Sequence, residues 1–348
     1  MGTPVHKHVL VIRLSAMGDV AMTVPVLRAL QEQHPNCTVT VLTRSFFSPM
    51  FAQLPQVSVF TADVKGRHKG ILGLWRLYRA LKQLGITEVV DLHAVLRSTI
   101  LKGFFKFGST PFFGIDKGRS DKKALTAPKK KVFAPLKSTH ERYATVFGLA
   151  GYPISLQKTH VLEKESLSPA ARTIAENRPR KWIGVAPFAA HEGKQYPLEL
   201  MKKALAVLQQ QVGCTLFLFG GGKKEQLLLD TLVGDTDRVN VTGKLSFADE
   251  LSLISNLDGM VAMDSGNAHL AAMYGVPVVT LWGVTHPFAG FYPFGQPDSL
   301  ALLADREQFP LIPTSVYGNK VPEGYENAIK TIGTEAIVQK VRAMLELS

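Results

Sequence analysis

A short polar turn between two apolar stretches carries residues whose types and spacing could do chemistry. Residues 259–263 are apolar, and the sequence D-S-G-N at 264–267 follows them directly, ahead of a helical stretch that contains His269. Backbone N–H groups at the start of a helix stabilise an anion, so the turn predicts a seat for a diphosphate, with Asp264 left to hold hydroxyls. An aspartate or serine at this place can equally be an N-cap, and His269 can be a buried core histidine.

A second polar turn lies near the start of the chain. Residues 9–14 have the pattern of a buried strand, and the sequence S-A-M-G-D at 15–19 leads from it into a helical stretch. Ligands bind beyond the carboxyl ends of strands in open α/β sheets, which is where Asp19 stands. Its carboxylate could therefore act as a general base toward a hydroxyl, or it could cap the helix.

The two turns together resemble glycosyltransferase family 9, the bacterial heptosyltransferases. That family has S-x-x-G-D after its first strand and D-[ST]-G-x-x-H-L in its donor motif, and both patterns occur here in that order, at 15–19 and 264–270. A third segment, K-Q-Y-P at 194–197, resembles the lysine, aromatic and proline stretch of the family. Hydroxyl residues often precede this lysine in relatives, whereas Ala189 and Ala190 stand here.

The resemblance implies an inverting glycosyltransferase that moves heptose from ADP-heptose to an inner-core lipopolysaccharide acceptor. Asp19 is then the general base, and the charge of Lys194 offsets the charge that develops on the leaving diphosphate. We expect no obligate cofactor and no metal site, with at most weak stimulation by an ion. The expected donor contacts are Lys194, Glu225, Leu245, Asp264, Ser265, Gly266 and His269. The expected acceptor contacts are Ser15, Gly18, Arg97, Lys122 and Lys123.

Strand-like and helical stretches alternate along the 348 residues, which is typical of parallel sheets with crossover helices. The alternation restarts near residue 182, after a polar stretch at 164–181 that we interpret as a linker. The sequence thus predicts an α/β protein with the GT-B fold, two facing Rossmann-like domains with parallel sheets. We expect an acceptor-binding domain at 1–165, a nucleotide-sugar domain at 166–327, and a terminal helix at 328–348, which in GT-B enzymes commonly crosses back to the first domain. Residues 109–138 are expected to form a long loop without regular structure.

The positive charge of the chain is concentrated in its first half. Residues 1–165 hold 24 Lys and Arg against 10 Asp and Glu, a net charge of +14, whereas residues 166–348 have a net charge of −2. Such a field indicates an anionic partner, and we expect a glycolipid at the inner face of the inner membrane, bound in part by the lysines at 122–131, and no nucleic acid. No apolar run is long enough to span a bilayer, so we expect a cytoplasmic monomer with peripheral membrane contact.

Other interpretations stay open. The motifs recognise diphosphate and base more than sugar, so a family 9 enzyme could use another nucleotide sugar. The basic half could belong to a non-catalytic protein that binds nucleic acid or another anionic ligand. The glycines at 220–222 could indicate a nicotinamide-dependent oxidoreductase, but they do not form G-x-G-x-x-G. Asp235 and Asp237 resemble a D-x-D metal motif, but they are remote in sequence from both phosphate motifs.

Overall fold

The chain, described here by a computed structural model for residues 7–178, 181–234 and 237–346, divides into two compact units. The first consists of Met1–Lys117 and Thr139–Leu162, and the second of Gly118–Ser138 and Glu163–Ser348. The first unit thus ends close to the predicted boundary at residue 165. Residues 118–138, predicted from the sequence to lie in the first domain, belong to the second unit instead.

Five parallel strands form the sheet of the first unit, in the order β3-β2-β1-β4-β5. Their bounds are β1 Lys7–Ile12, β2 Cys37–Thr43, β3 Val57–Thr61, β4 Glu88–Asp91 and β5 Phe112–Gly114. The central strand β1 pairs with β2 and β4 on its two sides, and Val9 to Ile12 are fully buried. Since the strands are parallel, the loops that follow β1 and β4 leave the sheet side by side at the same edge.

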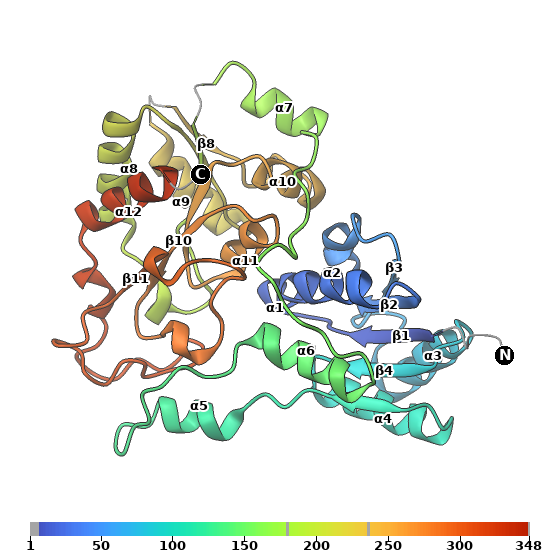
Figure 1. Ribbon diagram of the computed structural model, residues 1–348. Helices are drawn as coiled ribbons and strands as arrows, with labels where there is room; N and C mark the ends of the chain where they lie inside the picture. The colour runs from blue at the N-terminus through green and yellow to red at the C-terminus, as the bar shows by residue number, and fades with distance from the viewer. Residues whose placement is uncertain (1–6, 179–180, 235–236, 347–348) are drawn as a thin grey trace. The chain divides into compact units, whose positions relative to one another are not determined.

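Helices connect these strands and cover the sheet. They are α1 Met17–Ala21, α2 Thr23–Gln33, α3 Gly70–Lys82, α4 Leu96–Phe107 and α6 Thr139–Leu149, with the 3-10 helix η1 Ser45–Phe51. α3 and α4 pack against each other (Figure 1). The centre of the Phe104 ring lies 5.1 Å from the centre of the Trp75 ring and 5.8 Å from that of the Tyr78 ring. Their inner faces join β1 and β4 in one apolar core.

Six parallel strands form the second sheet, in the order β11-β10-β9-β6-β7-β8. Their bounds are β6 Trp182–Ala186, β7 Thr215–Leu218, β8 Arg238–Asn240, β9 Gly259–Met263, β10 Val278–Trp282 and β11 Ala301–Leu303. β9 pairs with β6 and with β10, so the segments that lead from β6 to Lys194 and from β9 to Asp264 start from neighbouring strands. The predicted α/β class with two parallel sheets is confirmed.

The helices of the second unit surround its sheet. They are α5 Arg119–Leu125, α7 Pro169–Ala175, α8 Leu198–Val212, α9 Gly222–Val233, α10 Phe247–Ile254, α11 Gly266–Ala272 and α12 Thr334–Glu346. The short 3-10 helices are η2 Glu192–Lys194, η3 Pro287–Ala289, η4 Asp298–Leu300 and η5 Ala328–Thr331.

The terminal helix α12 packs within the second unit, although the resemblance led us to expect that it crosses to the first domain. α12 lies beside α8 (Figure 1), and Ile337, Val341 and Met344 are buried in the core of this unit. Gly259 in β9 makes this close approach possible, because a Cβ there would lie 2.0 Å from Cε of Met344. The burial of its apolar side chains fixes the helix on this sheet.

Two segments expected to be irregular contain regular structure. The predicted linker at 164–181 holds α7, which Ser168 caps by accepting a hydrogen bond from the Ala171 amide, and which packs on α10. The predicted loop at 109–138 holds β5 and α5. Short strands and helices of three to seven residues are too brief for a hydrophobic period to indicate, so tertiary contacts decide them.

Candidate functional site

Asp19 lies in the first turn of α1, just beyond the carboxyl end of β1. Its Oδ2 atom is 2.6 Å from a guanidinium nitrogen of Arg13 and accepts a hydrogen bond of 3.2 Å from the Ala16 amide. The second contact is the carboxylate half of a capping box, in which Ala16 is the N-cap and Asp19 the third helical residue, so Asp19 helps to cap α1 without being its N-cap. The Asp19 side chain remains 26% exposed. Tyr143 of α6 donates to the backbone carbonyl of Asp19 at 3.2 Å and so helps to fix this turn.

His93 stands beside this turn, after β4. The amide of His93 donates to Asp91 Oδ1 at 2.9 Å, and the ring Nε2 lies 3.5 Å from the Ser15 hydroxyl. Burial, reinforced by the charges of Arg13 and Lys117, lowers the pKa of His93 to about 4, so its ring is neutral at physiological pH. No role was predicted for Arg13 or His93 from the sequence, although the parallel order of β1 and β4 brings both to Asp19.

The predicted acceptor residues of the first unit lie around the same edge of the sheet. Ser15 precedes α1, Gly18 lies in its first turn, and Arg97 occupies the first turn of α4 as an exposed cation. The charge of Arg97 reaches His93, where it contributes to the lowered pKa. The edge therefore combines the partly exposed Asp19 carboxylate with several cations and a neutral imidazole.

Lys194 and Asp264 form a buried ion pair in the second unit. Nζ of Lys194 lies 3.3 Å from Oδ2 of Asp264, and their side chains are 13% and 8% exposed. Gly318 lets the lysine reach this place, because a Cβ on it would come within 2.4 Å of the Lys194 side chain. Sequence reasoning predicted both charged residues, and the structure brings together two positions that are 70 residues apart.

The helix α11 begins immediately after this pair. Ser265 is its N-cap, but its hydroxyl does not cap the helix, and within the described residues Oγ is buried without a hydrogen-bond partner. Gly266 opens the helix, and His269 is buried in its second half. The backbone N–H groups of the first turn thus stand next to the Lys194 ammonium, an arrangement that suits an anion.

The two remaining predicted donor residues lie after the outer strands β7 and β8. Glu225, in the first turn of α9, accepts a hydrogen bond of 2.7 Å from the Gly221 amide through one carboxylate oxygen. Leu245 is half-buried in the turn before α10. The glycine-rich turn at 220–222 is therefore tied to Glu225 by this hydrogen bond.

The predicted acceptor residues Lys122 and Lys123 do not lie in a solvated loop of the first domain. Both belong to α5 in the second unit, where Lys122 is 8% exposed and its Nζ lies 4.3 Å from the centre of the Phe291 ring. Lys131, expected to help bind a membrane, donates hydrogen bonds to the Leu125 and Pro313 carbonyls at 2.9 and 2.7 Å. These contacts hold 118–138 on the second unit and engage Lys122 and Lys131 inside it, whereas Lys123, Lys129 and Lys130 are exposed.

Residues after β10 have structural roles that the sequence left open. Nδ1 of His286 accepts a hydrogen bond of 3.1 Å from the Phe288 amide, and its ring packs on Phe133 and Phe288. Burial, with the charge of Arg306, lowers the pKa of His286 to about 4. Thr285 is 1% exposed. Both side chains therefore belong to the packed interior of this unit.

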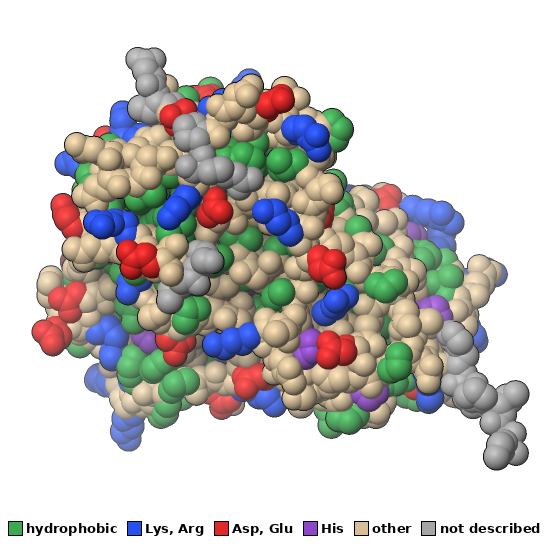
Figure 2. Space-filling view, turned by 45° about the horizontal axis from the view of Figure 1, so that its top comes forward, with side chains coloured by type: hydrophobic (Ala, Val, Ile, Leu, Met, Phe, Trp, Pro, Cys, Tyr) green, Lys and Arg blue, Asp and Glu red, His purple; other side chains and the backbone are tan. Residues whose placement is uncertain are grey.

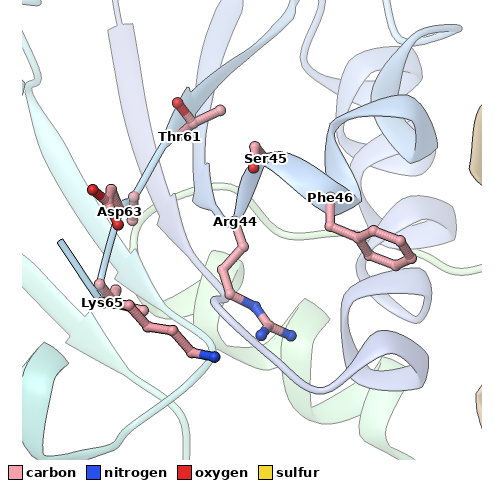
Figure 3. A pocket seen from close by; sticks show the side chains of 8 residues that line it. Arg44, Ser45, Phe46, Thr61, Asp63 and Lys65 are labelled. Atoms are coloured by element: carbon pink, nitrogen blue, oxygen red, sulfur yellow. The ribbon is translucent and has the colours of Figure 1, made fainter. Parts of the chain in front are cut away.

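A cavity of about 400 Å³ opens at the carboxyl ends of β2 and β3 in the first unit. Arg44 and Lys65 reach toward the same space, with Phe46 to one side (Figure 3). Arg44 is fixed by a hydrogen bond of 3.1 Å from its Nε to the Leu14 carbonyl, in the strand-to-helix turn that leads to Asp19. The only acid among the lining residues, Asp63, accepts hydrogen bonds from the Gly66 and Arg67 amides.

A second cavity, of about 720 Å³, lies in the second unit between the end of α5 and residues 311–322. Lys123 and Lys320 line it together with Tyr317. Among the described residues no group of three or more His, Cys, Asp and Glu could hold a metal ion, and Asp235 of the D-x-D sequence lies outside these residues. In the same described part of the chain, no helix combines the length and apolar character that crossing a membrane requires.

Known proteins resemble this chain over most of its length. It is 24% identical to the lipopolysaccharide core heptosyltransferase OpsX of Haemophilus influenzae, with 82% of this chain and 81% of that protein covered. It is 25% identical to lipopolysaccharide heptosyltransferase 1 of Pseudomonas aeruginosa, with the same coverage.

Solved structures agree with these relatives and confirm the GT-B fold. A family 9 glycosyl transferase from Veillonella parvula matches with a TM-score of 0.76 at 20% identity, over 99% of this chain and 98% of that one. The ADP-heptose lipopolysaccharide heptosyltransferase II of E. coli matches with a TM-score of 0.68 at 18% identity, over 98% and 99%. Residues 74–307 match the family itself, and the chain belongs to glycosyltransferase family 9 (heptosyltransferase).

Proposed function

We propose that this glycosyltransferase moves heptose, with inversion, from ADP-heptose to a lipopolysaccharide inner-core acceptor. The observation that carries the proposal is the buried pair of Lys194 and Asp264 at the start of α11. An ammonium and free helix N–H groups side by side suit a diphosphate, and they can stabilise the charge that develops on ADP as it leaves. Asp264 would hold donor hydroxyls, with Ser265, Gly266 and His269 around the phosphates.

The outer strands of the second sheet would recognise the rest of the nucleotide. Leu245 offers a half-buried apolar side chain against which adenine can pack. Glu225 keeps one carboxylate oxygen beyond its bond to the Gly221 amide, and that oxygen can accept a ribose hydroxyl.

Asp19 would take the proton of the attacking acceptor hydroxyl. Its carboxylate is held toward the edge of the sheet by Arg13 and Ala16 and remains partly exposed, so a hydroxyl can approach it. Inversion needs one such base and no covalent intermediate. Ser15, Gly18 and Arg97, on the same edge, would contact the acceptor.

The cavity of Arg44 and Lys65 would bind an anionic group of the acceptor. Two cations converge there beside Phe46, and the Asp63 carboxylate hydrogen-bonds to backbone amides instead of pairing with either cation (Figure 3). Phosphate and carboxylate groups suit such a place, because an Arg guanidinium binds them with two parallel hydrogen bonds. Arg44→Gln with Lys65→Gln should raise the acceptor KM about tenfold or more, whereas Lys129→Gln with Lys130→Gln should leave it unchanged.

The decisive experiment incubates the protein with acceptor and a panel of nucleotide sugars and measures the release of nucleoside diphosphate. ADP release from ADP-heptose supports the proposal, and release from a different sugar alone supports a family 9 enzyme with another donor. Activity should persist in excess EDTA, and a complete loss that magnesium restores would contradict a metal-independent mechanism. We further propose that the protein acts as a cytoplasmic monomer at the inner face of the inner membrane.

A further inference from the structure

The first turns of α3 present large apolar side chains to solvent. Ile71 is 67% exposed, Leu72 is 76% exposed and Trp75 is 43% exposed, and their spacing along the helix makes them neighbours on its surface. The opposite side of α3, with Leu74 and Leu77, already fills the core. A contiguous exposed apolar patch of this kind marks an interaction surface, whereas single exposed apolar side chains are common on protein surfaces and need no partner.

Cations flank this patch along the sequence, and no acid lies among its sequence neighbours. The 24 residues between Asp63 and Glu88 hold six Lys and Arg and no Asp or Glu. Lys69 precedes α3, and Arg76 and Arg79 lie on the exposed side of the helix. The first unit as a whole has 16 Lys and Arg against 7 Asp and Glu. Figure 2 shows one face of the molecule, on which Lys and Arg side chains are interspersed with Asp and Glu side chains.

We infer that this surface, the α3 face, docks on an anionic phospholipid bilayer. We define it by Lys69, Ile71, Leu72, Trp75, Arg76 and Arg79. A helix with an apolar stripe and flanking Lys or Arg lies in the membrane interface, with its apolar side chains at the level of the acyl boundary and its cations at the headgroups. Tryptophan is enriched at that depth.

The charge pattern favours lipid over a protein partner. A protein partner would need an acidic residue opposite each of these cations, whereas an anionic bilayer neutralises all of them at once. The inference rests on the proposed function in one respect only, the expectation that the acceptor is anchored in a membrane. It also gives α3 the membrane role that was expected of the lysines at 122–131, two of which, Lys122 and Lys131, are engaged within the second unit.

Trp75 provides a direct probe of docking. The chain has three tryptophans, and Trp182 and Trp282 are 6% and 1% exposed, so a change of emission on docking reports Trp75. Vesicles of phosphatidylethanolamine with phosphatidylglycerol should shift the emission of the full-length protein to shorter wavelength, and brominated acyl chains should quench it. Vesicles of phosphatidylcholine should do neither, and salt should weaken the effect.

Matched variants distinguish vesicle binding through the α3 face from nonspecific adsorption of the protein to vesicles. Ile71→Ser with Leu72→Ser should weaken vesicle binding about tenfold or more, since it removes two apolar side chains from the interface. Leu227→Ser with Leu228→Ser, which removes exposed apolar area from α9, should not. Lys69→Gln with Arg76→Gln should weaken binding about fivefold for each charge at low salt. Lys129→Gln with Lys130→Gln removes the same charge and should have no effect.

The outcomes separate docking from transfer, because the vesicle assay contains neither donor nor acceptor. Vesicle binding equal to wild type in the Ile71 and Leu72 variant, or no response of Trp75 while the protein binds vesicles, overturns the inference and leaves the proposed function intact. A dimer in sedimentation velocity that this variant converts to a monomer would overturn it too, since the patch would then pair two copies. If the α3 face docks on the bilayer, the Ile71 and Leu72 variant should lose heptose transfer to an acceptor embedded in vesicles and keep heptose transfer to a lipid-free acceptor.

Discussion

Replacing Asp19 with asparagine tests the chemical step, because it removes a base and nearly preserves the shape. The asparagine side chain of the Asp19→Asn variant can keep the bond from the Ala16 amide, since its carbonyl accepts as a carboxylate oxygen does. What the variant loses is the negative charge beside Arg13 and the ability to take a proton. We expect kcat to fall by roughly two to four orders of magnitude, the range of a general base, which corresponds to about 3–5 kcal/mol in the barrier.

The same substitution should cost little stability. Arg13 is 7% exposed and loses a partner at 2.6 Å, but it also donates to the Leu92 carbonyl and stays hydrogen-bonded. The side chain of Asp19 is partly exposed, so the lost ion pair is worth about 1–2 kcal/mol at most, and the melting temperature should fall by only a few degrees. ADP binding should be unchanged, because the Lys194 and Asp264 pair belongs to the second unit.

Arg13→Gln is the matched control, since it breaks the same ion pair and keeps the carboxylate. Single-turnover kinetics with ADP-heptose, thermal melts and ADP titration on both variants separate the two roles. A large loss of kcat in the Asp19 variant and a loss of about tenfold or less in the Arg13 variant support the base. Equal losses, or turnover of the Asp19 variant within a few-fold of wild type, would make Asp19 a residue that only caps α1.

Four further substitutions test the second unit. Lys194→Ala and Asp264→Ala should each weaken ADP binding about ten- to a hundredfold, as expected for one charged contact, and unchanged affinities in calorimetry would contradict the donor site. Because burial lowers the pKa of His286 from 6.5 to about 4, the unfolded chain binds a proton that the native state does not, and stability should fall by up to about 3 kcal/mol as pH drops from 6.5 to 4. His286→Asn keeps an acceptor for the Phe288 amide and should flatten that fall in thermal melts, and an unaltered slope would refute the cause. Lys131→Met should cost about 1–3 kcal/mol of unfolding free energy, whereas exposed Lys130→Met should cost nothing measurable, and equal melts would show that the bonds to Leu125 and Pro313 are dispensable.

The sequence could predict the positions of site residues that come soon after a buried strand. Asp19 and Asp264 follow long buried strands closely, and that pattern places them at the sheet edge whatever the rest of the chain does. The ion pair of Lys194 with Asp264 needed the strand order as well, since β6 and β9 are neighbours in space but not in sequence. Arg13 and His93 were missed for the same reason, because only the pairing of β1 with β4 shows that they share one edge.

Charge counting predicts the sign of a partner's charge, which stays a prediction, and it does not locate the basic surface. The lysines at 122–131 are close in sequence, and they were therefore interpreted as one basic surface. In the structure Lys122 lies over the Phe291 ring, and Lys131 donates hydrogen bonds to the Leu125 and Pro313 carbonyls, so neither ammonium points freely into solvent. Long cationic side chains can cover apolar surface and satisfy carbonyls, so a lysine in a basic run is not by itself a solvated charge.

The pairing of Lys194 with Asp264 gives a physical reason why the donor site that we propose would need an acid beside its anion-binding turn. A lysine that is 13% exposed would carry a large desolvation cost alone, and the carboxylate 3.3 Å away offsets that cost while no donor is bound. When a diphosphate arrives it can take over the ammonium, and Asp264 is then released to accept hydroxyls. Loss of Asp264 therefore acts twice, since it removes a hydroxyl acceptor and leaves a buried cation uncompensated. Loss of Lys194 leaves an unpaired buried carboxylate facing the phosphates, so this pair should show strong non-additivity in a double-mutant cycle.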